Sequence, residues 1–96
     1  SIDLDDTLPT ELELNQNYPN PFNPSTNISF SLPSTDEVKL SVFNSLGKEV
    51  AVIYQGVLQA GMHTYTFNAN QLASGIYIYQ LVSNDFLISR RMLLVK

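Results

Sequence analysis

The clearest pattern in the chain is a strict alternation of apolar and polar side chains over short stretches. In residues 27–32, Ile28, Phe30 and Leu32 fall on one face, and Pro33 follows the stretch. Successive side chains of a strand point to opposite faces, so this period of two predicts a half-buried strand. The pattern recurs along the chain, whereas no stretch shows the 3.6-residue period of an amphipathic helix.

The same period predicts six further strands, separated by turn-forming residues. In chain order they are expected at 38–43, 49–54, briefly at 57–58, then at 62–67, 76–82 and 86–95. Turns are expected at 44–47 and 83–85, and 55–61, with its two glycines, is expected to be a loop. The stretch 76–82 is apolar on both faces until Gln80, so it should be the most buried strand. About seven short strands predict an all-β, immunoglobulin-like antiparallel β-sandwich.

One local signal supports this fold. Leu72 and Gly75 precede Tyr77, which opens the next-to-last expected strand. A tyrosine in this position often turns its hydroxyl back to an upstream backbone group, an arrangement known as the tyrosine corner. The expected core therefore contains Phe30, Leu40, Val42, Leu72, Tyr77 and Leu81.

The segment 17–26 holds three prolines and cannot be a helix, because proline fixes φ and restricts the residue before it. Tyr18 and Phe22 are expected to be the apolar anchors that hold this segment to the sandwich. In the final strand, residues 92–95 are apolar on both faces and are expected to be largely buried. Lys96 is expected to be a solvated terminal cation with little effect on stability.

Composition excludes several classes of protein. The 96 residues suit one domain, and they include no cysteine and one histidine, which excludes disulfides, thiolate metal sites and multi-histidine sites. No apolar run is long enough to span a bilayer, and the start does not resemble a signal peptide. The chain begins at Ser1 rather than methionine, so we expect a piece of a longer protein.

Charge is placed unevenly along the chain. Residues 1–13 hold five of the nine acidic residues and none of the five basic ones, and the net charge is −4. The remainder lacks the basic stripe that nucleic acid or an anionic membrane surface requires. We expect 1–13 to be an acidic linker to a larger upstream protein, and 14–96 to be the folded domain. Asp3, Asp5 and Asp6 alternate partly like calcium ligands, but the glycine turn and distal glutamate of a calcium loop are missing.

Candidate chemistry is sparse. No nucleophile motif accompanies His63, so a packed or edge-exposed histidine is favoured over a catalytic base. Asp36 and Glu37 fit a solvated turn better than an acid–base pair. Asn27 begins a glycosylation triplet, but it falls within an expected strand. The sequence therefore predicts no catalytic residue, no metal site and no cofactor.

Several motifs, in order, resemble one family. These are residues 14–26, 42–50, 61–63, 72–79 and 91–96, which are similar to the type A C-terminal sorting domains of the type IX secretion system of Bacteroidetes and related phyla. The resemblance covers all but the leader, and a more distant one is to the immunoglobulin-like domain of the flagellar hook-capping protein. Relatives more often carry Trp-Asp where this chain has Phe67 and Asn68.

The resemblance implies a sorting signal. A cargo upstream in the same chain would cross the periplasm, pass through an outer-membrane translocon, and reach the cell surface or the medium. A sortase-like peptidase would typically cut near the domain and attach the cargo to a lipopolysaccharide. Carried over motif by motif, the candidate sorting residues are Tyr18, Pro19, Asn20, Pro21, Gly75, Tyr77, Arg91, Met92, Leu93, Leu94, Val95 and Lys96.

Two functions remain open from the sequence. A sorting signal needs a stable folded body and a chain end that the machinery can recognise. If the final strand lies at the edge of a sheet, it could be recognised by strand addition. The alternative is an accessory immunoglobulin-like module that binds a polysaccharide or a protein. A polysaccharide-binding module would present an exposed aromatic platform.

Overall fold

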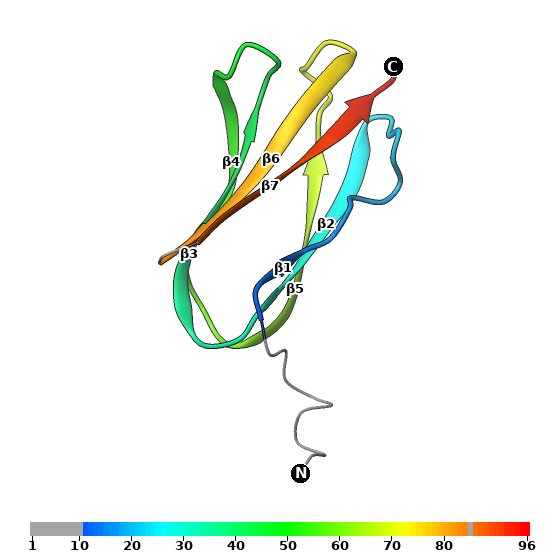
Figure 1. Ribbon diagram of the computed structural model, residues 1–96. Coiled ribbons are helices and arrows are strands. Elements are labelled where there is room, and N and C mark those ends of the chain that lie inside the picture. The colour runs from blue at the N-terminus through cyan, green and yellow to red at the C-terminus, as the bar shows by residue number, and fades with distance from the viewer. Residues whose placement is uncertain (1–10, 85) are drawn as a thin grey trace.

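The computed structural model describes residues 11–84 and 86–96, which form seven strands and no helix. The strands are β1 (Glu13–Leu14), β2 (Ser25–Leu32), β3 (Asp36–Phe43), β4 (Glu49–Leu58), β5 (Gly61–Asn68), β6 (Gly75–Ser83) and β7 (Phe86–Leu94). One antiparallel sheet has the order β1-β2-β5, and the other has the order β4-β3-β6-β7. The sheets face each other in Figure 1, which confirms the predicted all-β sandwich.

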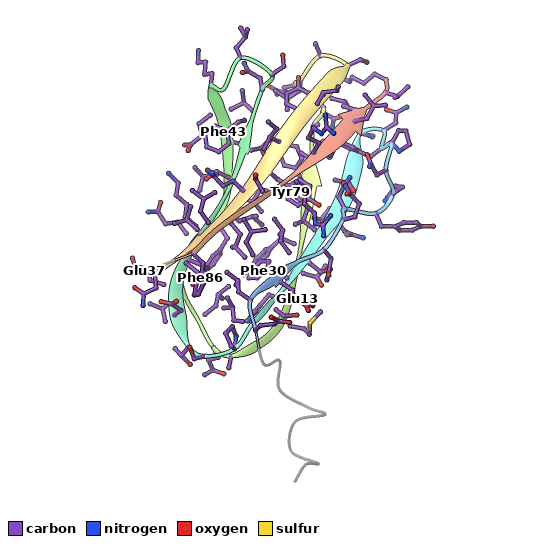
Figure 2. The ribbon with its side chains drawn as sticks, viewed as in Figure 1. Glu13, Phe30, Glu37, Phe43, Tyr79 and Phe86 are labelled. Carbon is purple, nitrogen blue, oxygen red and sulfur yellow. The ribbon has the colours of Figure 1, made fainter. Side chains whose placement is uncertain are left out.

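The core lies between the sheets and follows the predicted alternation. Of the six expected core residues, Phe30, Leu40, Val42, Tyr77 and Leu81 are buried. Figure 2 shows the Phe30 side chain in the space between the two layers. Leu72 is only half-buried and packs against the core from the loop before β6. The alternation therefore identifies residues within strands better than residues in loops.

The expected loop at 55–61 is wrong at 55–56 and at 61, and the brief strand expected at 57–58 is the end of β4, not a separate strand. β4 continues without a break to Leu58, and only Gln59 and Ala60 separate it from β5. Gly56 lies within the strand at φ +153°, and a Cβ there would meet the Tyr54 hydroxyl at 2.9 Å. The glycine thus makes room for a neighbouring side chain instead of ending the strand.

The expectation that β6 is the most buried strand is also wrong. Its inward residues are buried, but Ile76 and Val82 are 50% and 38% exposed. β2 and β3 bury more of their length. In a two-layer sandwich each sheet has one face toward water, so an apolar side chain on the outer face stays exposed whatever its type.

The predicted turn at 44–47 is confirmed by its hydrogen bonds. The Asn44 Oδ1 atom accepts from the N–H groups of Leu46 and Lys48, and Gly47 adopts φ +85°. In the turn between β6 and β7, Asn84 has φ +30°, while Asp85 lies outside the described residues. Residues 1–10 also lie outside them, so the expected linker and the partial calcium pattern at Asp3, Asp5 and Asp6 stay predictions.

Candidate functional site

The sequence motifs that lie far apart along the chain meet at one end of the sandwich. The proline segment, defined here as residues 16–22, lies beside the end of β7, and the loop before β6 contacts Lys96. Figure 1 shows this end at the top, with the chain terminus, while β1 begins toward the opposite end. We call this region the motif end.

The proline segment crosses from one sheet to the other. Tyr18 exchanges two backbone hydrogen bonds with Asn27 of β2, at 3.0 and 2.9 Å. Four residues later, the Phe22 N–H donates to the Leu93 carbonyl at 2.9 Å, and the Phe22 carbonyl accepts from the Val95 N–H at 3.0 Å. The segment therefore ties the two sheets together at their shared margin.

A buried polar cluster holds the segment, and no local sequence pattern indicates it as a whole. The Tyr79 hydroxyl donates to the Asn15 carbonyl at 2.6 Å and accepts from the Asn17 N–H at 2.8 Å. The Asn17 Nδ2 atom donates to Thr26 Oγ1 at 2.9 Å, and Thr26 Oγ1 donates to the Pro19 carbonyl at 2.8 Å. The side chains of this cluster that are buried, those of Asn17, Thr26 and Tyr79, all have hydrogen-bond partners. Satisfied buried polar groups favour one conformation, so the cluster orders the segment.

The environment of Tyr79 also affects its ionisation. Burial raises the pKa of its hydroxyl, and the hydrogen bond from Asn17 and the charge of Arg90 offset this only in part. The signal that could have identified the cluster is the position of Tyr79, two residues after Tyr77 and therefore on the same inward face.

Only one of the two expected anchors is correct. Phe22 is 1% exposed and packs against Phe67, with ring centroids 6.4 Å apart. Tyr18 is 79% exposed, so its side chain does not anchor the segment. Its backbone bonds to Asn27 do this instead, and they leave the ring free to face solvent.

The tyrosine corner is confirmed. The Tyr77 hydroxyl donates to the Ala73 carbonyl at 2.7 Å, and the side chain is buried. Gly75 enters β6 at φ +153°, where a side chain would be strained although the space around it is open. These two candidate residues shape the loop that Lys96 contacts.

Burial of the final strand is one-sided, which corrects the expectation for 92–95. Met92 and Leu94 are 2% and 0% exposed, whereas Leu93 and Val95 are 38% and 48% exposed. The outer face carries Arg91 and Leu93, since alternation places both opposite the core. The motif end therefore presents a cation beside apolar side chains.

Lys96 is not only the solvated terminal cation expected from the sequence. Its Nζ atom donates to the carbonyls of Asn70 and Leu72, at 2.6 and 2.9 Å, and its N–H donates to Ser74 Oγ at 2.9 Å. The side chain is exposed but caps two carbonyls of the loop before β6. It therefore connects the chain end to the tyrosine corner.

The edge of β7 at the motif end is already occupied. β7 is an edge strand, as strand addition requires. However, the Arg91 carbonyl accepts from Gln16 Nε2 at 2.8 Å, the Leu93 N–H donates to Asn20 Oδ1 at 3.0 Å, and Val95 bonds to Phe22. An added strand along 91–95 would have to displace the proline segment.

The residues considered above for catalysis, His63 and Asp36, make contacts within the fold. His63 stacks near Phe30, with ring centroids 5.6 Å apart, and its Nε2 atom lies 2.7 Å from the Gln59 carbonyl. Asp36 accepts a hydrogen bond from the Ser83 hydroxyl. Within 11–84 and 86–96, no group of three or more His, Cys, Asp or Glu side chains could hold a metal ion. In the same ranges, no helix is long and apolar enough to cross a membrane.

The fold and these contacts define a small β-sandwich module with a tightly held motif end. The sequence model of the secretion system C-terminal sorting domain family matches residues 16–96, and the chain belongs to this family. It is a type IX C-terminal sorting signal, and the family is not one of enzymes. Membership implies involvement with the type IX secretion system, an upstream cargo and export across the outer membrane. A search of the curated proteins found no significant match.

Proposed function

We propose that the type IX machinery recognises the motif end as a folded surface. The carried-over candidates converge there through named hydrogen bonds, although they come from three separate parts of the sequence. The single observation that carries the proposal is the pairing of Phe22 with β7, which places 18–21 beside 91–95. A folded surface of this kind can be recognised after the domain has formed.

The position of β1 supports this function. β1 begins toward the end of the sandwich opposite the motif end (Figure 1), so a cargo joined through 1–13 would leave the motif end free. We take 14–96 as the sorting domain and 1–13 as an acidic linker, which a sortase-like peptidase would cut before Glu13, the first residue of β1. The cargo would be in the periplasm in transit, and then on the cell surface or secreted.

The experiment is a fusion of residues 1–96 behind a periplasmic reporter, expressed in a type IX-competent host. We expect the reporter on the cell surface or in the medium, and the reporter without the domain in the periplasm. A fusion that folds but stays in the periplasm would contradict the proposal.

A polysaccharide-binding module is the weaker alternative. The two most exposed aromatic side chains of the described chain are Tyr18 and Phe86, at 79% and 62%. Phe86 begins β7, whereas Tyr18 belongs to the segment that pairs with the end of β7. They therefore do not form one stacking platform.

A further inference from the structure

The first half of β7 presents an open backbone edge. The strand partner of β7 among the described residues is β6, on one side. Leu93 turns its N–H and C=O away from β6, toward Asn20 and Phe22. Because this direction alternates along an antiparallel pair, Leu87 and Ser89 turn their N–H and C=O groups outward as well. No hydrogen bond within 11–84 and 86–96 uses these outward groups.

This open edge, residues 87–90, differs from the end of the strand, which the proline segment covers from the Arg91 carbonyl onward. It spans about 13 Å at roughly 3.3–3.4 Å per residue, a length that suits a short added strand. A hollow of about 550 Å³ lies beside it, lined by Gln16, Ile78, Ser89, Arg90 and Arg91.

The edge is cationic. Arg90 and Arg91 are adjacent and exposed, and neither forms an ion pair with a described acidic residue. The ion pair found among residues 11–84 and 86–96 joins Lys39 to Glu49 at 3.2 Å and does not involve either arginine. The Nε atom of Arg90 donates to the Leu14 carbonyl, which holds this cation at the margin between the two sheets.

The outer faces of the two sheets differ in polarity. By alternation and register, six exposed apolar side chains lie on the outer face of the four-stranded sheet: Val52, Val57, Ile76, Val82, Leu87 and Leu93. The outer face of the other sheet carries mostly hydroxyl and amide side chains, among them Asn27, Ser29, Thr64 and Thr66. A strand added at 87–90 would extend the apolar face, since its outward side chains would lie beside Leu87.

We infer that an extended segment of a partner protein, carrying acidic and apolar side chains, adds to the four-stranded sheet along 87–90. Backbone hydrogen bonds hold the segment, acidic side chains pair with the two arginines, and apolar ones cover Leu87. The inference rests on the proposed function, because the partner is taken to be a component of the export machinery. It adds a second contact surface beside the motif end.

The test blocks the edge without touching the bonds to β6. Ser89→Pro removes an outward N–H, and proline is tolerated at edge positions of this kind. The matched control is Thr64→Pro in β5, the edge strand of the other sheet. Thr64 pairs with Ser29, whose carbonyl bonds to Asn15 on the far side, so the Thr64 N–H also points outward. With melting temperatures measured in parallel, we expect Ser89→Pro to lower export of the reporter fusion at least tenfold and Thr64→Pro to leave it unchanged.

A second pair of variants keeps the test decisive if proline unfolds the domain. Leu87→Asp/Ser89→Asp makes the edge acidic, and Met62→Asp/Thr64→Asp is its control on β5, where Met62 is as exposed as Leu87. A loss of export confined to the β7 variants supports the inference. Normal export of folded β7 variants overturns it and leaves the arginines as protection against edge aggregation, while the proposed function stands. Retention of the wild-type fusion in the periplasm overturns both.

Discussion

Single polar residues decide how the motif end is held, and these were the least predictable from sequence. The Tyr77 bond is local, reaching four residues back to Ala73, so a motif could indicate it. The bonds of Tyr79 reach 62 and 64 residues back, to Asn17 and Asn15, and alternation says nothing about such partners. The hydrogen bonds of Lys96 cannot be predicted from a local pattern for the same reason, because its carbonyl partners lie in a distant loop.

Tyr79→Phe should destabilise the domain by about 1–3 kcal/mol. It removes the hydroxyl that pairs with Asn15 and Asn17, and unpaired buried polar groups carry a desolvation cost of this size. Tyr18→Phe, at an exposed ring, should change the free energy of unfolding by less than about 0.5 kcal/mol. Denaturant unfolding of both variants measures the difference. Equal stabilities would remove the polar cluster from this account.

The raised pKa of Tyr79 predicts a loss of stability in alkali. The folded state favours the neutral hydroxyl, so its contribution is complete below the unfolded pKa of about 10. That contribution is lost as the pH rises through the folded pKa. Unfolding curves from pH 8 to 11 should show stability falling above pH 10, less steeply in Tyr79→Phe. An identical slope in wild type and variant would contradict this.

At the scale of elements, alternation predicted the longer strands, though not β1, and it did not predict which faces are exposed to water. A run such as 92–95 is apolar at every position, so its pattern does not distinguish two buried faces from one. The two-layer architecture decides the matter by leaving one face of β7 outside. A glycine in the sequence likewise does not by itself indicate a turn. Gly47 lies in a turn, whereas Gly56 lies inside β4, where it accommodates the Tyr54 side chain.

The one-sided burial of β7 can be tested by two adjacent substitutions. Leu94→Ala should cost about 2–5 kcal/mol, because it leaves a cavity in the core. Leu93→Ala should cost less than about 1 kcal/mol, since that side chain is 38% exposed. Thermal or denaturant unfolding distinguishes them. Similar costs at both positions would mean that the outer face of β7 is covered in the free domain.

At the scale of the whole molecule, the sandwich separates two tasks. The core and turns build a stable body, and contacts between distant segments build a motif end away from the start of β1 (Figure 1). The fold class and the family were predictable because strands follow a local period and the family's motifs are local strings. Their convergence was not, because it depends on how β7, the proline segment and the loop before β6 pack together.

The most direct test of the account asks whether export follows the charge of the motif end or only the stability of the domain. The two variants are Arg91→Glu/Lys96→Glu and its neutral control Arg91→Met/Lys96→Met. Both lose the Lys96 bonds to Asn70 and Leu72, so both should show the same small loss of stability, about 1 kcal/mol. Melting temperature and surface reporter are measured on each. The account predicts much lower export for the charge-reversed fusion than for the neutral one at matched melting temperature, and equal export of the two would contradict it.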